Sequence, residues 1–276
     1  MPITHTAFSN GCYFTLAARL THLTGNSKYS VNANDAYSWL TKMGFIDTTY
    51  RVFDGGYVEQ NCTDINKAQF SQSSAMITLG AAYMYNVVCS PLSSSTTLLT
   101  RCQTNTPDSP WKDRVANLTT ATLATFFPEG VAYEISCETR QGSCTRDMIN
   151  FKGYTHRWLA ATSQMAPFTR DTILPVLKTS AEAAVKQCTG GGSGRACGFY
   201  WADGKYVTPK TAGVGEQMGV LAAVESLLVG EGVGSSGGST GGTGGSARGS
   251  GNGNGAPGGN TKSAASRREV GGLGCI

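Results

Sequence analysis

Residues 9–26, SNGCYFTLAARLTHLTGN, decide the fold class because they contain every signal of one complete helix. Ser9 or Asn10 supplies a candidate N-cap, Gly25 and Asn26 supply a stop, and apolar side chains keep helical spacing between them. The predicted helix therefore begins close to the start of the chain. This leaves no room for a signal peptide, which needs a basic start, an apolar run and a cleavage site.

Helical spacing recurs along the chain, and no segment shows the pattern of a convincing strand. Six further helices are predicted at 31–43, 67–88, 111–127, 150–166, 171–187 and 215–229. Helices rich in small and apolar residues alternate with more polar, amphipathic ones. This alternation is typical of a ring in which outer helices cover inner ones, so we expect an all-α fold.

Long irregular segments join each predicted outer helix to the next inner helix, namely 45–68, 128–149 and 188–214. Long loops gathered at one end of a helical scaffold commonly build a binding cleft. We therefore expect a ligand site at that end of the fold.

The cysteine content and two glycosylation sequons are typical of an oxidising, secretory compartment. The chain has nine cysteines, and the sequons begin at Asn61 and Asn117. This conflicts with the missing signal peptide. Either the sequence lacks an N-terminal part, which we expect, or the cysteines are reduced and the sequons are chance matches.

Two cysteine pairs have the spacing of small disulfide-closed loops. Cys137 and Cys144 enclose six residues, and Cys188 and Cys197 enclose a glycine-rich run. Neither pair has the second Cys-His pair that a zinc site needs, so we expect disulfides and no metal. The five remaining cysteines are odd in number, and their pairing stays open.

Charge and composition narrow the classes of partner. The net charge is only +4 and the basic residues are scattered, which argues against a nucleic-acid partner. No run of 18 apolar residues occurs, so no membrane span is expected. We predict one domain over 1–229 with a surface insertion near 89–110, followed by a disordered Gly/Ser-rich linker and tail over 230–276. A lipid-anchor signal is not encoded in this tail, because its apolar end is missing.

A series of motifs, in order from about residue 6 to residue 229, resembles the fungal members of glycoside hydrolase family 76. The motifs include LAARL at 16–20, FDG at 53–55, GAAYMYN at 80–86, APFT at 166–169 and GVGEQM at 213–218. Those relatives are mannan endo-1,6-α-mannosidases, among them cell-wall proteins anchored by glycosylphosphatidylinositol. The resemblance implies a partial (α/α)6 toroid of about seven helices, which would be the C-terminal part of the family fold.

The resemblance also implies a catalytic pair of adjacent aspartates, one the nucleophile and one the general acid/base. No two acidic residues are adjacent anywhere in this sequence, so we expect the pair upstream of it and transfer no catalytic position. Glycoside cleavage with retention needs two carboxyl groups about 5 Å apart, and inversion needs a wider gap. We predict that Glu216 is a first-turn carboxylate stabilised by its helix.

Candidate substrate contacts come from the predicted cleft. Aromatic rings stack on pyranose faces, and amide and carboxylate groups bind sugar hydroxyls. The candidates are Asn10, Asp54, Tyr57, Phe70, Glu134 and Trp201. Two departures from the family pattern bear on this site: the missing acid pair, and the run QFSQSS at 69–74, which replaces a Trp-Ser-Tyr-Asn run at an inner-helix start.

The resemblance therefore implies an enzyme that hydrolyses or transglycosylates α-1,6-mannosidic linkages, with no cofactor. Its partner would be α-1,6-mannan or the core glycan of glycosylphosphatidylinositol, and the intact protein would be secreted to the cell wall or the outer face of the plasma membrane. The alternative is a non-catalytic, mannan-binding or truncated remnant.

Overall fold

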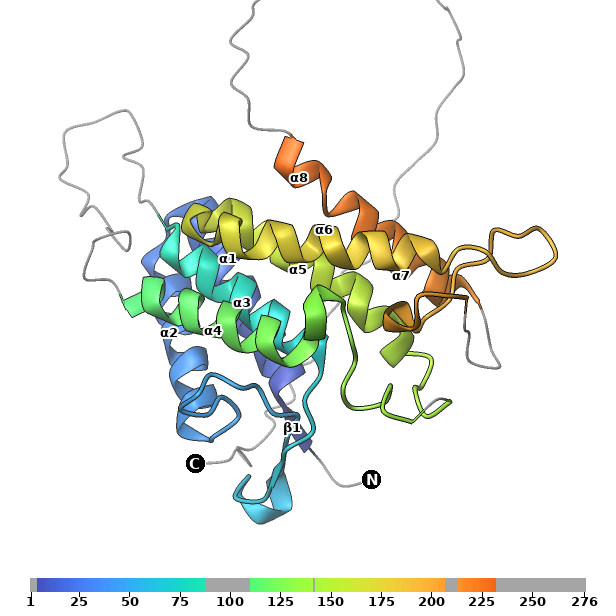
Figure 1. Ribbon diagram of the computed structural model, residues 1–276. Coiled ribbons are helices and arrows are strands. Elements are labelled where there is room, and N and C mark those ends of the chain that lie inside the picture. The colour runs from blue at the N-terminus through green and yellow to red at the C-terminus, as the bar shows by residue number, and fades with distance from the viewer. Residues whose placement is uncertain (1–3, 88–109, 141, 207–212, 232–276) are drawn as a thin grey trace, which may run out of the picture.

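The computed structural model describes residues 4–87, 110–140, 142–206 and 213–231 (Figure 1). Its helices are α1 (Ala7–Thr24), α2 (Ser27–Lys42), α3 (Ser71–Tyr85), α4 (Pro110–Phe126), α5 (Phe151–Met165), α6 (Arg170–Lys186), α7 (Val214–Glu225) and the short α8 (Leu228–Glu231). The predicted all-α class and each predicted long helix are thereby confirmed in this part of the chain. Residues 88–109 and 232–276, which hold most of the predicted insertion and tail, lie outside the described residues.

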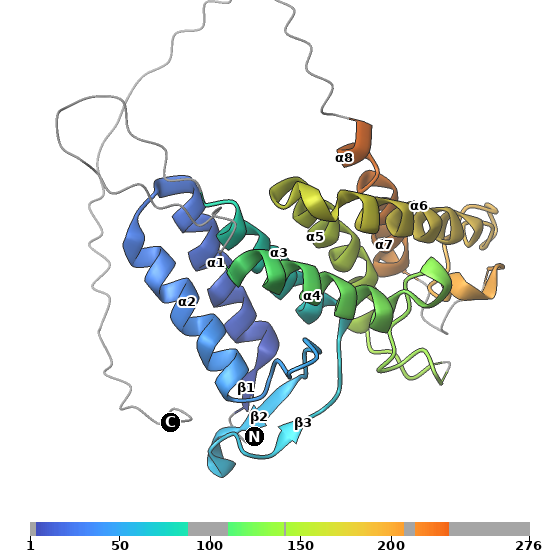
Figure 2. The same ribbon diagram turned by 60° about the vertical axis from the view of Figure 1, so that its left-hand side comes forward.

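The helices form a partial ring with an inner row and an outer cover. Helices α1, α3, α5 and α7 pack one against the next, while α2 lies against α1, α4 against α3, and α6 against both α5 and α7. Figures 1 and 2 show α1 and α7 at opposite ends of this row. The alternation of apolar and amphipathic helices in the sequence corresponds to this arrangement.

The inner helices α1 and α3 approach each other closely at a glycine. A Cβ atom on Gly80 would lie 2.6 Å from the Phe14 ring, closer than any real contact. The Thr15 hydroxyl of α1 donates a hydrogen bond to the Met76 carbonyl of α3 at 3.0 Å. Only a residue without a side chain therefore allows this packing.

A small three-stranded antiparallel sheet lies at the end of the ring where α1 begins. Its strands β1 (Thr4–Thr6), β2 (Gly55–Tyr57) and β3 (Ile65–Asn66) pair in that order. The expectation of no strand was wrong, because strands of two or three residues are too short to show a period of two. A Cβ on Gly55 would lie 2.1 Å from the His5 carbonyl oxygen, so β1 and β2 need this glycine.

Several helix boundaries differ from the prediction by up to about one turn, for local reasons. Thr6, and neither Ser9 nor Asn10, is the N-cap of α1, because its hydroxyl accepts the Ser9 N–H at 3.1 Å. Asn26 caps the start of α2 in the same way. The predicted helix 67–88 begins at Ser71, because β3 occupies Ile65–Asn66, and the helix predicted at 215–229 is divided into α7 and α8.

None of the described helices is both long and apolar enough to cross a bilayer.

Candidate functional site

The long connections meet at the end of the ring where α3 and α5 begin. The Ser136 hydroxyl, in the segment 127–150, donates to the Gln69 carbonyl just before α3. The Gly142 N–H of the same segment donates to the Tyr200 hydroxyl, in the segment 187–206, at 2.8 Å. The predicted gathering of loops at one end of the scaffold is therefore present among the described residues.

The buried carboxylate of Glu134 holds the first residue of α3. It accepts the Ser71 N–H at 3.3 Å and the Ser71 hydroxyl at 2.6 Å, and Thr155 of α5 donates to that same hydroxyl. Glu134 is fully buried, and this burial raises its pKa to about 7 although the Ser71 hydrogen bonds favour the charged form. Glu134 therefore has a structural role here, and the prediction that it contacts sugar is wrong for this structure.

A buried ion pair ties α5 to two of the loops. The Lys152 ammonium lies 2.9 Å from the Glu138 carboxylate, and both side chains are almost fully buried. Lys152 also donates to the Phe199 carbonyl, and Glu138 accepts the Glu134 N–H. Burial raises the pKa of Glu138 and lowers the pKa of Lys152. Both charges have partners inside the protein, so they fix the loops and do not face a ligand.

Trp201 has no free ring face for a sugar. Its side chain is 2% exposed, its ring lies 5.3 Å from the His156 ring, and its indole N–H donates to the Gly198 carbonyl. His156 donates to the Lys152 carbonyl and accepts from Ser180, and burial lowers the pKa of His156 to about 4. The prediction that Trp201 stacks on substrate is therefore wrong for this structure; the ring completes a core.

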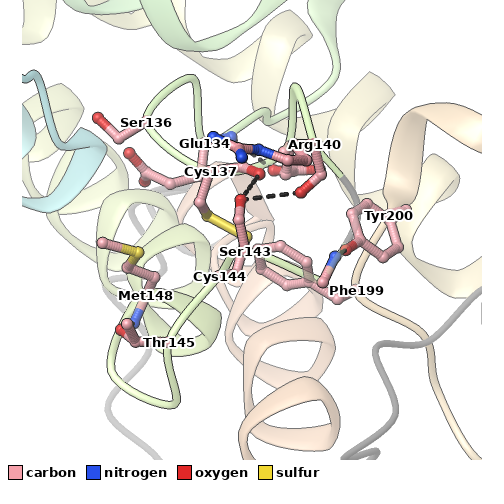
Figure 3. Close-up of a disulfide and its surroundings, with 12 residues drawn as sticks. Glu134, Ser136, Cys137, Arg140, Ser143, Cys144, Thr145, Met148, Phe199 and Tyr200 are labelled. Atoms are coloured by element: carbon pink, nitrogen blue, oxygen red, sulfur yellow. Dashed lines mark hydrogen bonds between the residues drawn. A yellow bond between two sulfur atoms is a disulfide. The ribbon is translucent and has the colours of Figure 1, made fainter.

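Two disulfides close the loops at this end. Cys137 is bonded to Cys144 and Cys188 to Cys197, as the spacing predicted. Figure 3 shows the first of them, with the Ser143 hydroxyl donating to the Cys137 carbonyl at 2.6 Å.

The other described cysteines differ in state. Cys62 is disulfide-bonded, and Cys12 is a free thiol.

Asp54 and Tyr57 meet in a small pocket beside the sheet. The pocket, of about 50 Å³, is lined by residues of β1, β2 and β3 and by Asp54, and His5 is one of the lining residues. Asp54 is half-buried, which raises its pKa, and it accepts a hydrogen bond from the Asn66 side chain at 2.9 Å. Tyr57 is 38% exposed. These two predicted contacts keep surface available for a ligand.

Asn10 lies in a neighbouring hollow that the same His5 lines. This hollow, of about 380 Å³, lies between α1 and α2, and its other lining residues are Tyr13, Asn32, Asp35, Ala36 and Trp39. The amide of Asn10 donates to the Thr6 carbonyl, which leaves its carbonyl oxygen for other contacts.

Phe70 lies apart from both hollows, at the start of α3, with its ring edge-on to Phe151 at 5.8 Å between centroids. It is partly exposed there, so it remains a prediction as a ligand contact.

Neither of the two hollows beside the sheet is lined by two acidic residues. Glu134 and Glu138 are both buried and bound within the protein, and Asp54 is the one acidic residue that lines its pocket. No group of three or more His, Cys, Asp or Glu side chains that could hold a metal occurs in the part of the chain that the structure describes.

Sequence reasoning did not single out Lys152, Ser71 or His5. The sequence signal that could have found Lys152 is its position in the first turn of a helix with few other charges. Its partner, Glu138, is known only from the fold. The aromatic residues Tyr13 and Trp39 were not among the predicted contacts, although both line the hollow at Asn10.

Comparison with known proteins gives a consistent assignment. Residues 3–237 match glycosyl hydrolase family 76. The chain is 37% identical over 227 residues to the mannan endo-1,6-alpha-mannosidase DFG5 of Saccharomyces cerevisiae, which covers 80% of this chain and 44% of that protein. It is 37% identical over 221 residues to a putative mannan endo-1,6-alpha-mannosidase of Schizosaccharomyces pombe, covering 80% and 46%.

Solved structures show the same fold. Dfg5 from Chaetomium thermophilum, crystallised with glucosamine, is 51% identical with a TM-score of 0.74, and the match covers 83% of this chain and 52% of that one. An inactive variant of an α-1,6-mannanase from Salegentibacter, in complex with α-1,6-mannotriose, is 16% identical with a TM-score of 0.59, which indicates shared fold alone. The chain spans about half the length of the curated relatives it matches, and it belongs to glycosyl hydrolase family 76.

Proposed function

We propose that this chain is part of a mannan endo-1,6-α-mannosidase that cleaves α-1,6-linked mannose chains of the fungal cell wall. The observation that carries the proposal is the family match over residues 3–237, together with 37% identity to fungal relatives that bear this name. The loop end of the ring, with its disulfides and buried ion pair, supplies a rigid wall for the substrate.

The chain's own contribution is binding and orientation of the sugar. Asp54 supplies a carboxylate acceptor for sugar hydroxyls, and the exposed ring of Tyr57 supplies a face for a pyranose. The two carboxyl groups that attack the sugar carbon and protonate the leaving oxygen come from outside this chain.

A chimaera tests this proposal. The half of Chaetomium thermophilum Dfg5 that this chain does not match is joined ahead of the 276-residue chain, and release of oligosaccharides from linear α-1,6-mannan is measured. We expect endo-acting release by the chimaera and none by the chain alone. A folded chimaera that leaves the mannan intact, or release of mannose oligomers by the chain alone, contradicts the proposal.

A matched pair of aromatic variants in the chimaera separates binding from folding. Tyr57→Ala removes an exposed ring at the candidate pocket, so we expect a higher KM. Phe168→Ala removes a ring of equal exposure, 39% against 38%, beyond the opposite end of α5, so we expect no change in KM. Equal KM values for the two variants would show that Tyr57 does not contact the substrate.

The acceptor and the exact glycan are part of the same proposal. Water gives hydrolysis, and a sugar hydroxyl of another glycan gives transglycosylation. Mannan incubated with a labelled acceptor mannoside distinguishes the two outcomes by the label's appearance in longer chains. The core glycan of glycosylphosphatidylinositol as substrate tests the second partner in the same assay.

Secretion to the wall or to the outer face of the plasma membrane is also proposed. Two disulfides and the exposed sequon residues Asn61 and Asn117 support passage through an oxidising compartment. Secreted chimaera should lose mass on treatment with an endoglycosidase, and the double variant N61Q/N117Q should not.

The alternative function is a non-catalytic, mannan-binding or truncated remnant. The absence of adjacent acidic residues from the sequence favours it for the chain alone. Mannan binding by the chimaera without cleavage would support this alternative over the enzyme.

A further inference from the structure

A hollow that the proposed function does not use lies where α7 begins beside the turn that precedes α5. Its volume is about 470 Å³, which is the size of a pocket for a small ligand. One wall is formed by Arg146 and the end of the 3-10 turn Met148–Asn150, and the other by the start of α7 from Gly213 to Met218. We call it the α7 hollow. It shares no lining residue with the pocket of Asp54.

Glu216, which lines the α7 hollow, uses only one of its two carboxylate oxygens. Its side chain is 3% exposed, and Oε2 accepts the Gly213 N–H at 2.9 Å. The other oxygen, Oε1, is buried and has no hydrogen-bond partner among the residues that the structure describes. A buried carboxylate oxygen without a donor is costly, because it has lost its contact with water. Oε1 is therefore an acceptor for which this part of the chain supplies no donor.

Two further polar groups line the α7 hollow. The Asn150 side-chain amide donates to the Arg146 carbonyl at 3.0 Å. Its oxygen Oδ1 lies next to Gly215, where an added Cβ would come within 3.1 Å of it. Arg146 is exposed and forms no ion pair in the described ranges. The α7 hollow thus combines two oxygen acceptors with one charged donor.

The charges of the α7 hollow favour a neutral ligand rich in hydroxyl groups. The Arg146 guanidinium disfavours a second cation, and the Glu216 carboxylate disfavours an anion. Neighbouring hydroxyls of a pyranose donate to Glu216 and Asn150, and their oxygens accept from Arg146. Val214 and Met218, which are 73% and 54% exposed, supply apolar surface for the C–H face of the ring.

We propose that the α7 hollow binds one pyranose ring and that Glu216 accepts one of its hydroxyl groups through Oε1. The inference rests on the proposed function only for the identity of the sugar, a mannose unit of an α-1,6-linked chain. Glu216 is a binding residue in this proposal and takes no part in bond cleavage. The test therefore needs no catalytic activity and uses the 276-residue chain.

The test titrates α-1,6-mannotriose into the chain and follows the amide NMR signals of Gly213 and Gly215, with Kd from calorimetry. The decisive variant is Glu216→Gln. Its amide oxygen can still accept the Gly213 N–H, but its NH₂ group replaces the acceptor Oε1 with a donor. We expect Kd to rise at least about tenfold. The thermal midpoint should not fall, because the variant keeps the cap and removes a buried charge.

Two other variants test the assigned place of the sugar. Gly215→Ala puts a Cβ 3.0 Å from the Ile149 side chain and 3.1 Å from Asn150 Oδ1, so it narrows the α7 hollow and should raise Kd with unchanged helix content by circular dichroism. The matched control is Asp171→Asn, which changes an exposed acidic residue in the first turn of α6 and should leave Kd unchanged.

Two results would overturn the proposal. One is that mannotriose leaves the signals of Gly213 and Gly215 unmoved. The other is an equal Kd for Glu216→Gln and the unsubstituted chain, which would mean that a water molecule satisfies Oε1.

The α-1,6-linked glucose trisaccharide separates this inference from the proposed function. If it binds as tightly as mannotriose and Glu216→Gln weakens it equally, the α7 hollow is a pyranose site and the inference stands, while the choice of mannose loses support. A chimaera that binds mannan through Glu216 and leaves it uncleaved would contradict the proposed function and support the binding site.

Discussion

Helices α3 and α7 are both apolar inner helices of one ring, yet their surroundings differ. From Ser71 to Ala82, α3 is buried between α1, α4 and α5, whereas α7 exposes 73% of Val214 and 57% of Leu221. The composition of a helix therefore reports the place it occupies in the ring. It does not report how much of the helix surface the rest of the protein buries.

The two helices also begin differently. The first N–H of α3 binds the carboxylate of Glu134, which lies 63 residues further along the chain. Helix α7 is capped from within, because the Glu216 carboxylate accepts the Gly213 N–H at 2.9 Å. The start of α3 is therefore capped by a residue of the folded loops, whereas the carboxylate that caps α7 lies in the first turn of α7 itself.

The largest effect is expected where a charge is buried between α5 and the loops. Lys152→Met leaves the Glu138 carboxylate buried without its partner, so we expect a loss of about 3–5 kcal/mol in the free energy of unfolding, measured with urea. Lys186→Met on the exposed side of α6 is the control and should change little. Because Glu138→Gln removes the stranded charge, the double variant should recover part of the loss. No recovery would contradict the assigned pairing.

A second pair of variants compares the two inner helices directly. Ile77→Ala on α3 opens a cavity at a fully buried site, so we expect a loss of about 2–5 kcal/mol. Leu221→Ala on α7 removes exposed surface, and we expect a change within about 0.5 kcal/mol. The same urea experiment measures both. Equal losses would show that the exposed side of α7 at Leu221 is already covered in the isolated chain.

Local signals predicted much of the fold, because the residues that cap a helix and set its apolar spacing lie close together in the sequence. Gly25 ends α1 in a left-handed conformation, and Glu216 caps α7, both as the sequence indicated. The short strands were not predicted, because β2 pairs with Thr4–Thr6, some fifty residues earlier in the chain.

The candidate site was predictable in part for the same physical reason. Asp54 and Tyr57 lie near each other in sequence and share a pocket. Trp201 and Glu134 were expected at a ligand, but a loop residue can be buried by a distant helix, and composition carries no sign of that. His156 and Ser71 are the partners that decide their roles.

A third experiment follows the cap of α3 through pH. Because the folded pKa of Glu134 is about 7 and its ordinary value is 4.5, the folded state keeps a proton that the unfolded state loses. Glu134 therefore lowers stability as pH rises from 4.5 to 7, by about 3 kcal/mol at about 1.4 kcal/mol per pKa unit. Glu134→Gln should remove this slope in thermal unfolding.

Two controls isolate the Glu134 contribution. Glu129→Gln changes an exposed carboxyl and should keep the slope. His156 acts in the opposite direction, because its pKa of about 4 lies below the ordinary 6.5, so its contribution to stability is lost as pH falls through that range. It is common to all three proteins and cancels in their difference. A slope that is the same in Glu134→Gln as in the unsubstituted chain would assign the titration to another group.

The smallest effect comes from one methyl group placed on each inner helix. Gly80→Ala on α3 puts a Cβ 2.6 Å from the Phe14 ring and 2.7 Å from the Thr15 hydroxyl, so we expect a loss of about 1–3 kcal/mol. Gly219→Ala on α7 meets nothing closer than 3.7 Å, so the better helix propensity of alanine should make it neutral or stabilising by up to about 1 kcal/mol. Urea unfolding of both variants gives the sign. A destabilising Gly219→Ala would mean that α7 is packed as tightly as α3 and that the difference between the two helices lies only at their outer faces.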